Sequence, residues 1–112
     1  MIDNHERTEW LVVKLRESLP LPAKLTPQLA ALVRKEKPDI SVPQTCPITR
    51  VDYAGDEGGI MCRVEIGSED EPAVFYVSIT HLAFDRRLPL AREITTYQKH
   101  RTKRIRFINR AA

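Results

Sequence analysis

Apolar residues recur three and four positions apart near the N-terminus, which predicts an amphipathic helix over about residues 4–18. Its inward stripe consists of Thr8, Leu11, Val12, Leu15 and Leu19. The prolines of LPLPA, residues 19–23, end this helix because proline cannot donate a backbone hydrogen bond. Thr26-Pro27 predicts a second helix over about residues 27–36, with threonine as its cap and proline at the first helical position.

From residue 48 onward the apolar period changes to two, which predicts three strands separated by two turns. The predicted strands are ITRVDYA (48–54), IMCRVEIG (60–67) and AVFYVSITH (73–81). In the second of them, Ile60, Cys62, Val64 and Ile66 share one face, and Met61, Arg63 and Glu65 share the other. This alternation is typical of an antiparallel sheet that is covered on one side.

A third apolar stripe with helical spacing follows Pro89, a residue that suits the first turn of a helix. The stripe contains Leu90, Ile94, Tyr97, Ile105 and Ile108, with an interruption at Arg101. Two interpretations remain open. Either one helix spans about residues 89–109, which we favour, or the helix ends near Lys103 and RIRFI, residues 104–108, forms a short edge strand.

These elements predict a single α+β domain over residues 1–112. It would contain two N-terminal helices, a three-stranded antiparallel meander and a long C-terminal helix packed on one face of the sheet. A chain of 112 residues, with 42% hydrophobic and 29% charged residues, has the size and composition of a globular domain. The polar N-terminus and the short longest apolar run, AVFYV, predict a cytoplasmic protein without membrane contact.

Charge divides the chain into an acidic body and a basic end. Residues 1–85 carry nine Lys/Arg and fourteen Asp/Glu, a formal charge of −5, whereas residues 86–112 carry nine Lys/Arg and one Asp/Glu, a formal charge of +8. The total of +3 therefore conceals a directed field.

The basic end provides the candidate binding residues for nucleic acid or another anion. If the helix continues, Lys99, Lys103, Arg106 and Arg110 form one row that could follow phosphates. Arg92 lies outside this row and could extend it, and Arg86 and Arg87 precede the helix N-terminus, where anions bind favourably. The full candidate set is Arg86, Arg87, Arg92, Lys99, Arg101, Lys103, Arg106 and Arg110. The alternative is a solvated helix face that only aids solubility.

The predicted element order offers one comparison. Without the second helix, the order α-β-β-β-α resembles the double-stranded-RNA-binding domain, a family with a lysine-rich KKxAK-type motif at the start of its last helix. The corresponding stretch here, RRLPLAREIT, holds arginines at positions 86, 87 and 92 and no lysine. We therefore do not assign the chain to that family.

Catalytic and metal-binding patterns are not found in the sequence. The histidines, His5, His81 and His100, lack metal-ligand spacing, and the two cysteines, Cys46 and Cys62, lack the spacing of a zinc site or a disulfide framework. No nucleophile elbow or glycine-rich phosphate loop occurs. We expect no enzyme activity, no catalytic residue, no metal, no cofactor, and two free thiols in or near strands.

Three functional hypotheses remain. The first is a small non-enzymatic binding or regulatory module whose basic C-terminal helix contacts nucleic acid or an acidic protein. The second is a structural, self-associating interaction domain, a homo-oligomer in which the basic face is only solubilising. The third is ligand binding on the open sheet face around Arg50, Arg63 and Tyr76.

Overall fold

The computed structural model describes residues 5–67 and 72–111, with side chains at all of these positions except 56, 57, 72 and 103–111. Its elements are α1 (His5–Glu17), β1 (Leu21–Leu25), α2 (Pro27–Glu36), β2 (Cys46–Tyr53), the short α3 (Gly55–Gly58), β3 (Ile60–Gly67), β4 (Pro72–Ser78), the 3-10 turn η1 (Ile79–His81), β5 (Leu82–Ala83) and α4 (Ala91–Ala111). The predicted α+β class is confirmed.

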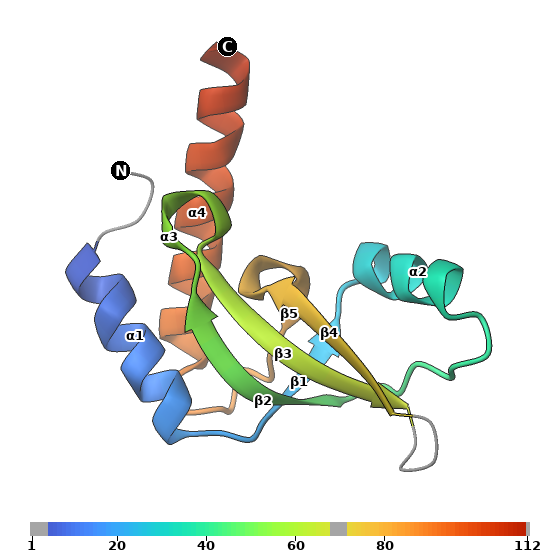
Figure 1. Cartoon of the computed structure of the whole chain (residues 1–112). Coiled ribbons are helices and arrows are strands. Elements are labelled where there is room, and N and C mark those ends of the chain that lie inside the picture. Colours follow the sequence, from blue (N-terminus) through green and yellow to red (C-terminus); the bar gives the residue numbers. More distant parts are fainter. Residues whose placement is uncertain (1–4, 68–71, 112) are drawn as a thin grey trace.

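A curled antiparallel sheet of five strands forms the centre of the molecule (Figure 1). The strand order is β4-β3-β2-β1-β5, so the two outer strands, β4 and β5, are consecutive in the chain. Only the three residues of η1 connect them. A connection this short holds the two edges of the sheet near each other, and the sheet has to curl to allow it.

The predicted three-stranded meander was wrong in extent, because β2, β3 and β4 belong to this larger sheet. The segment LPLPA does end the first helix, but it then continues as β1, which separates the two N-terminal helices. Pro22 of β1 lies opposite Pro47 of β2. Neither proline can donate a ladder hydrogen bond, which is why the stretch looked like a helix stop and not a strand.

The end of the third predicted strand was also wrong. Extended structure stops at Ser78, and residues 79–81 turn as η1. The Ser78 hydroxyl accepts a hydrogen bond from the Thr80 backbone N–H at 3.3 Å, which caps this turn. Ile79 stays fully buried, so the apolar signal was correct although the backbone conformation was not.

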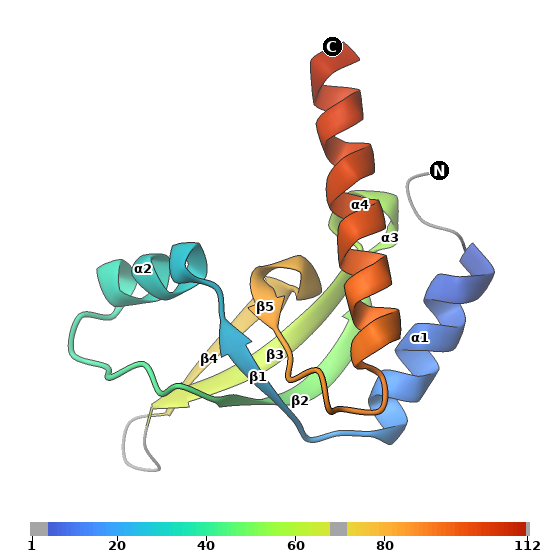
Figure 2. The ribbon, with the colours of Figure 1, turned by 180° about the vertical axis from the view of Figure 1, so that it is seen from behind.

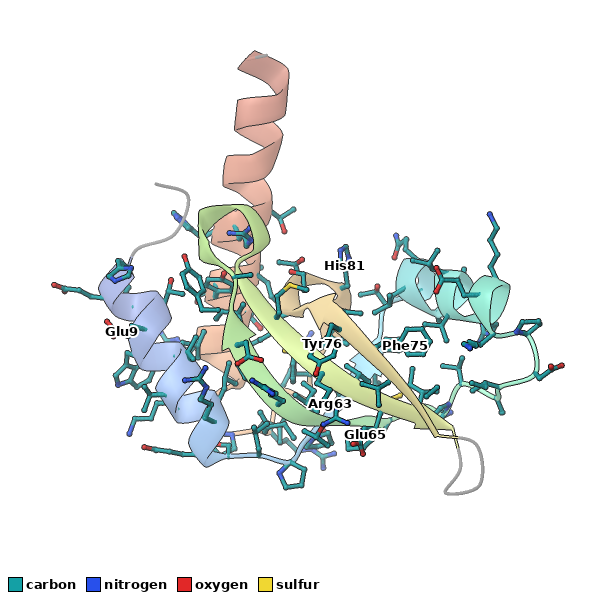
Figure 3. The ribbon with its side chains drawn as sticks, in the orientation of Figure 1. Glu9, Arg63, Glu65, Phe75, Tyr76 and His81 are labelled. Carbon is teal, nitrogen blue, oxygen red and sulfur yellow. The ribbon has the colours of Figure 1, made fainter. Side chains whose placement is uncertain are left out.

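The core lies between the concave face of the sheet and the helices. The alternation predicted for β3 is confirmed: its inward residues Ile60, Cys62, Val64 and Ile66 are buried. The helices contribute buried residues to the same cluster, namely Leu11, Val12, Leu15, Leu29, Val33, Ile94 and Tyr97. Figure 3 shows the opposite face of the sheet, where Arg63, Glu65 and Tyr76 lie.

The basic C-terminal segment is one continuous helix, α4, so the favoured of the two interpretations is confirmed. The helix begins at Ala91, two residues later than predicted. Its first half packs on the body, and its C-terminal part extends beyond the sheet (Figures 1 and 2). The basic end of the chain therefore projects away from the acidic body.

Candidate functional site

Two polar side chains fix the packed half of α4 against the sheet. The N–H of Ile60, at the start of β3, donates to Tyr97 Oη at 3.1 Å in a buried position. Gln98 Nε2 donates to the carbonyl oxygens of Ile79 at 2.8 Å and Leu82 at 2.7 Å. Gln98 thus satisfies backbone acceptors at the connection between the outer strands, where the ladder is interrupted. The position of α4 is therefore set by directional bonds in addition to apolar packing.

Arg101 completes this attachment and corrects a prediction. It was a candidate anion-binding residue, but its side chain is only 2% exposed. A β-carbon added at Gly59 would lie 2.5 Å from Arg101 Nε and 2.7 Å from Tyr97 Oη. The guanidinium therefore packs against the backbone of the turn between α3 and β3, and it is not available to an external ligand.

A groove lies between α1 and α4, and it encloses about 490 Å³. Figures 1 and 2 show that the two helices diverge from their meeting point near the base of the molecule. The lining residues are Arg7, Thr8, Trp10 and Leu11 from α1, and Arg92, Glu93, Thr96, Tyr97 and His100 from α4. The volume falls within the usual range of small-molecule sites.

The groove combines an aromatic surface with charges of both signs. Trp10 is 48% exposed, although it is a large apolar side chain. Arg7 and Trp10 are three residues apart, so they are neighbours on one face of α1. Arg92 is exposed on the opposing helix. Glu93 supplies the opposite charge, and its Oε2 atom is buried without a hydrogen-bond partner among the described residues.

The remaining predicted residues divide into three groups. Arg92 and Lys99 are exposed and seven residues apart, so they lie on the same face of α4. Arg86 is exposed in the loop that precedes the helix. The side chains of Lys103, Arg106 and Arg110 lie outside the described residues, although their backbone is helical.

Arg87 is exposed, but it already has an anionic partner. Its Nη2 atom donates to Asp85 Oδ2 at 3.0 Å, and its Nε atom donates to Asp85 Oδ1 at 3.2 Å. The Arg87 side-chain hydrogen bonds, with its backbone N–H, lower the pKa of Asp85 to about 2. A ligand anion would have to displace this carboxylate, so Arg87 is a weaker candidate than Arg92 or Lys99.

The open sheet face has the geometry required by the third hypothesis. Arg50, Arg63 and Tyr76 lie opposite one another on β2, β3 and β4, and Tyr76 is 57% exposed. Each arginine, however, is paired with a carboxylate two residues further along its own strand. Arg50 Nε lies 2.8 Å from Asp52 Oδ2, and Arg63 Nη2 lies 3.7 Å from Glu65 Oε1. This face therefore has much of its charge neutralised.

Reasoning from the sequence missed the groove, because its lining comes from two helices about 80 residues apart in the chain. One signal was available for Arg101, which interrupts the apolar stripe of α4 between Tyr97 and Ile105. A charged residue in an inward stripe indicates a buried, partnered side chain. No comparable signal connected Trp10 with Arg92.

The described residues contain no cluster of His, Cys, Asp and Glu that could hold a metal ion. Cys46 and Cys62 are buried, free thiols in β2 and β3. Burial raises the pKa of the Cys62 thiol to about 12, so its nucleophilic thiolate is strongly disfavoured. None of the helices in the described ranges is long and apolar enough to cross a membrane.

The α1–α4 groove and the exposed cations of α4 thus form the candidate site. They place an exposed indole, basic side chains and one unpartnered carboxylate oxygen next to a projecting basic helix. Comparison with protein-family models, with curated proteins and with solved structures found no match to this chain, so the site is interpreted from its own geometry.

Proposed function

We propose that this chain is a small non-enzymatic binding module that holds nucleic acid along the basic face of α4. The observation that carries the proposal is the shared face of Arg92 and Lys99, which adjoins the groove containing the half-exposed Trp10. Basic side chains bind phosphates independently of base sequence, and an exposed indole adds a surface on which an unpaired base can stack.

The shape of the molecule supports this proposal in spite of the acidic body. The C-terminal part of α4 extends beyond the sheet, so that its cations lie away from most of the carboxylates (Figure 2). Charges in solution are screened over about 8–10 Å at physiological salt. A polyanion aligned with the outer part of α4 would therefore experience mainly the local positive potential.

Binding of fluorescently labelled DNA and RNA, single-stranded and duplex, tests the proposal over a range of salt concentrations. The wild type should bind at low salt and weaken steadily as salt is added. The double variant Arg92→Gln/Lys99→Gln should bind about tenfold more weakly at low salt, and its salt slope should be shallower by about two phosphate contacts. Its melting temperature should remain near that of the wild type, because isolated surface charges contribute little to stability.

Arg34→Gln/Lys35→Gln is the matched control, since both residues are exposed in the last turn of α2 and the change in net charge is the same. This variant should retain most of the binding. Equal losses in the two double variants would show only general attraction by positive charge. Absence of wild-type binding to every nucleic acid at low salt would refute the proposal and leave an acidic protein as the partner to test.

A second candidate function has one observation in its favour. β4 is an outer strand of the sheet, and it exposes Val74 and Tyr76 on its convex face. Such an edge can pair with a strand of another molecule. Sedimentation of the wild type and of a Val74→Lys variant distinguishes this function: self-association through β4 requires a dimer that the lysine disrupts, and a wild-type monomer at high concentration would exclude it.

A further inference from the structure

Phosphate binding alone does not account for the α1–α4 groove, because Glu93 also lines it. A carboxylate repels phosphate, and the buried Oε2 atom of Glu93 has no hydrogen-bond partner among the described residues. Leaving an ionised oxygen unpaired in a partly dehydrated position is unfavourable. The terminal torsion of a glutamate side chain is broad, so either oxygen can be turned toward the groove. This position therefore favours a ligand with N–H donors.

The other lining groups restrict the chemical class of that ligand. Arg7 and Arg92 disfavour a simple cation, which would otherwise suit a carboxylate beside an indole. Trp10 favours a flat aromatic group. A ligand that satisfies all of these groups has an anionic part, an aromatic part and N–H donors. A nucleotide has these three properties together.

We propose that the α1–α4 groove binds one unpaired guanine of a bound nucleic acid, an inference that rests on the proposed nucleic-acid binding by α4. Guanine stacks against Trp10, and its N1–H and N2–H donate to the two oxygens of Glu93. Arg7 and Arg92 lie at the flanking phosphates. Unpaired bases are commonly read in this way, by stacking and by hydrogen bonds to their Watson–Crick edge.

Guanine fits Glu93 better than the other bases because of its donor pattern. Two adjacent N–H groups on its Watson–Crick edge match the two oxygens of one carboxylate. Adenine and cytosine present a single amino group beside a ring acceptor, which would face a carboxylate oxygen unfavourably. Uracil and thymine present one N–H between two carbonyls. Inosine keeps the N1–H of guanine and lacks its 2-amino group, so it reports the second hydrogen bond separately.

Trp10 gives a direct measurement, because it is the single tryptophan of the chain. Single-stranded oligothymidylates with one central guanine, inosine or adenine are titrated into the protein, and Trp10 fluorescence is followed. The guanine strand should quench the fluorescence and bind about tenfold more tightly than the adenine strand, with inosine in between. Glu93→Gln should remove this preference while affinity for plain oligothymidylate stays the same or rises, since a negative charge is lost. Its melting temperature should not fall, because the unpartnered charge is removed.

The controls separate failure of this inference from failure of the proposed function. Glu36→Gln, an exposed carboxylate of α2, carries the same charge change and should retain the guanine preference. Arg92→Gln/Lys99→Gln should weaken all strands without changing their order. Wild-type binding that ignores the central base, or a preference that survives Glu93→Gln, would overturn the guanine site while nucleic-acid binding stands. No binding of any strand would overturn both.

Discussion

Gly59 should be the least replaceable glycine of this chain, and the variant Gly59→Ala tests how α4 is attached. The backbone of Gly59 has φ +67°, in the left-handed region, where a residue with a β-carbon costs about 1–2 kcal/mol. The added β-carbon would also lie 2.5 Å from Arg101 Nε and 2.7 Å from Tyr97 Oη. Both side chains are buried, so neither can simply move into solvent.

The steric part of the loss follows from what those side chains do. Overpacking a filled site typically costs about 1–3 kcal/mol. If Tyr97 shifts, the buried N–H of Ile60 loses its acceptor, which adds about 1–3 kcal/mol. We therefore expect Gly59→Ala to lower the free energy of unfolding by about 3–6 kcal/mol in total, which is a large part of the stability of a small domain.

Gly55→Ala is the matched control. Gly55 also has a positive φ, +78°, but an added β-carbon would have no neighbour within 4 Å. This variant should lose only the backbone contribution, about 1–2 kcal/mol. Urea denaturation followed by circular dichroism measures both losses. Equal losses in the two variants would refute the close packing of Arg101 and Tyr97 on this turn.

Three further predictions concern the sheet, the 3-10 turn and the thiols. Val64→Asp should unfold the protein or cost several kcal/mol, because it buries an unpaired carboxylate, whereas Glu65→Val on the outer face should cost little; similar losses in a denaturation experiment would contradict the facing of β3. Gln98→Glu should lower the free energy of unfolding by about 1–3 kcal/mol, because a carboxylate cannot donate to the two carbonyl oxygens at η1, while Lys99→Glu next to it should have a smaller effect on the urea midpoint. Cys62 should resist a thiol reagent at pH 8 in the folded protein and react after denaturation, because burial raises its pKa to about 12; rapid reaction under native conditions would show that β3 is accessible.

Much of the local structure was determined by the sequence alone. The helical spacing of apolar residues located α1 and α2 nearly to the residue, and the period of two located β3 with its inward and outward faces. These features depend on neighbours close in the chain, and a repeated pattern of burial is enough to predict them. The continuity of α4 also followed from its stripe, in spite of the arginine within it.

The size and curl of the sheet were decided by tertiary structure. Pairing of β1 with β2 and β5 joins segments that have few residues and two prolines among them, so no local pattern marks them as strands. The candidate site was decided in the same way. Trp10 and Arg92 line one groove because α1 and α4 both pack on the sheet, and Arg101 is buried because Gly59 leaves room for it. A sequence shows which side chains carry charge, but whether a given charge faces solvent, a groove or a backbone turn depends on contacts between segments far apart in the chain.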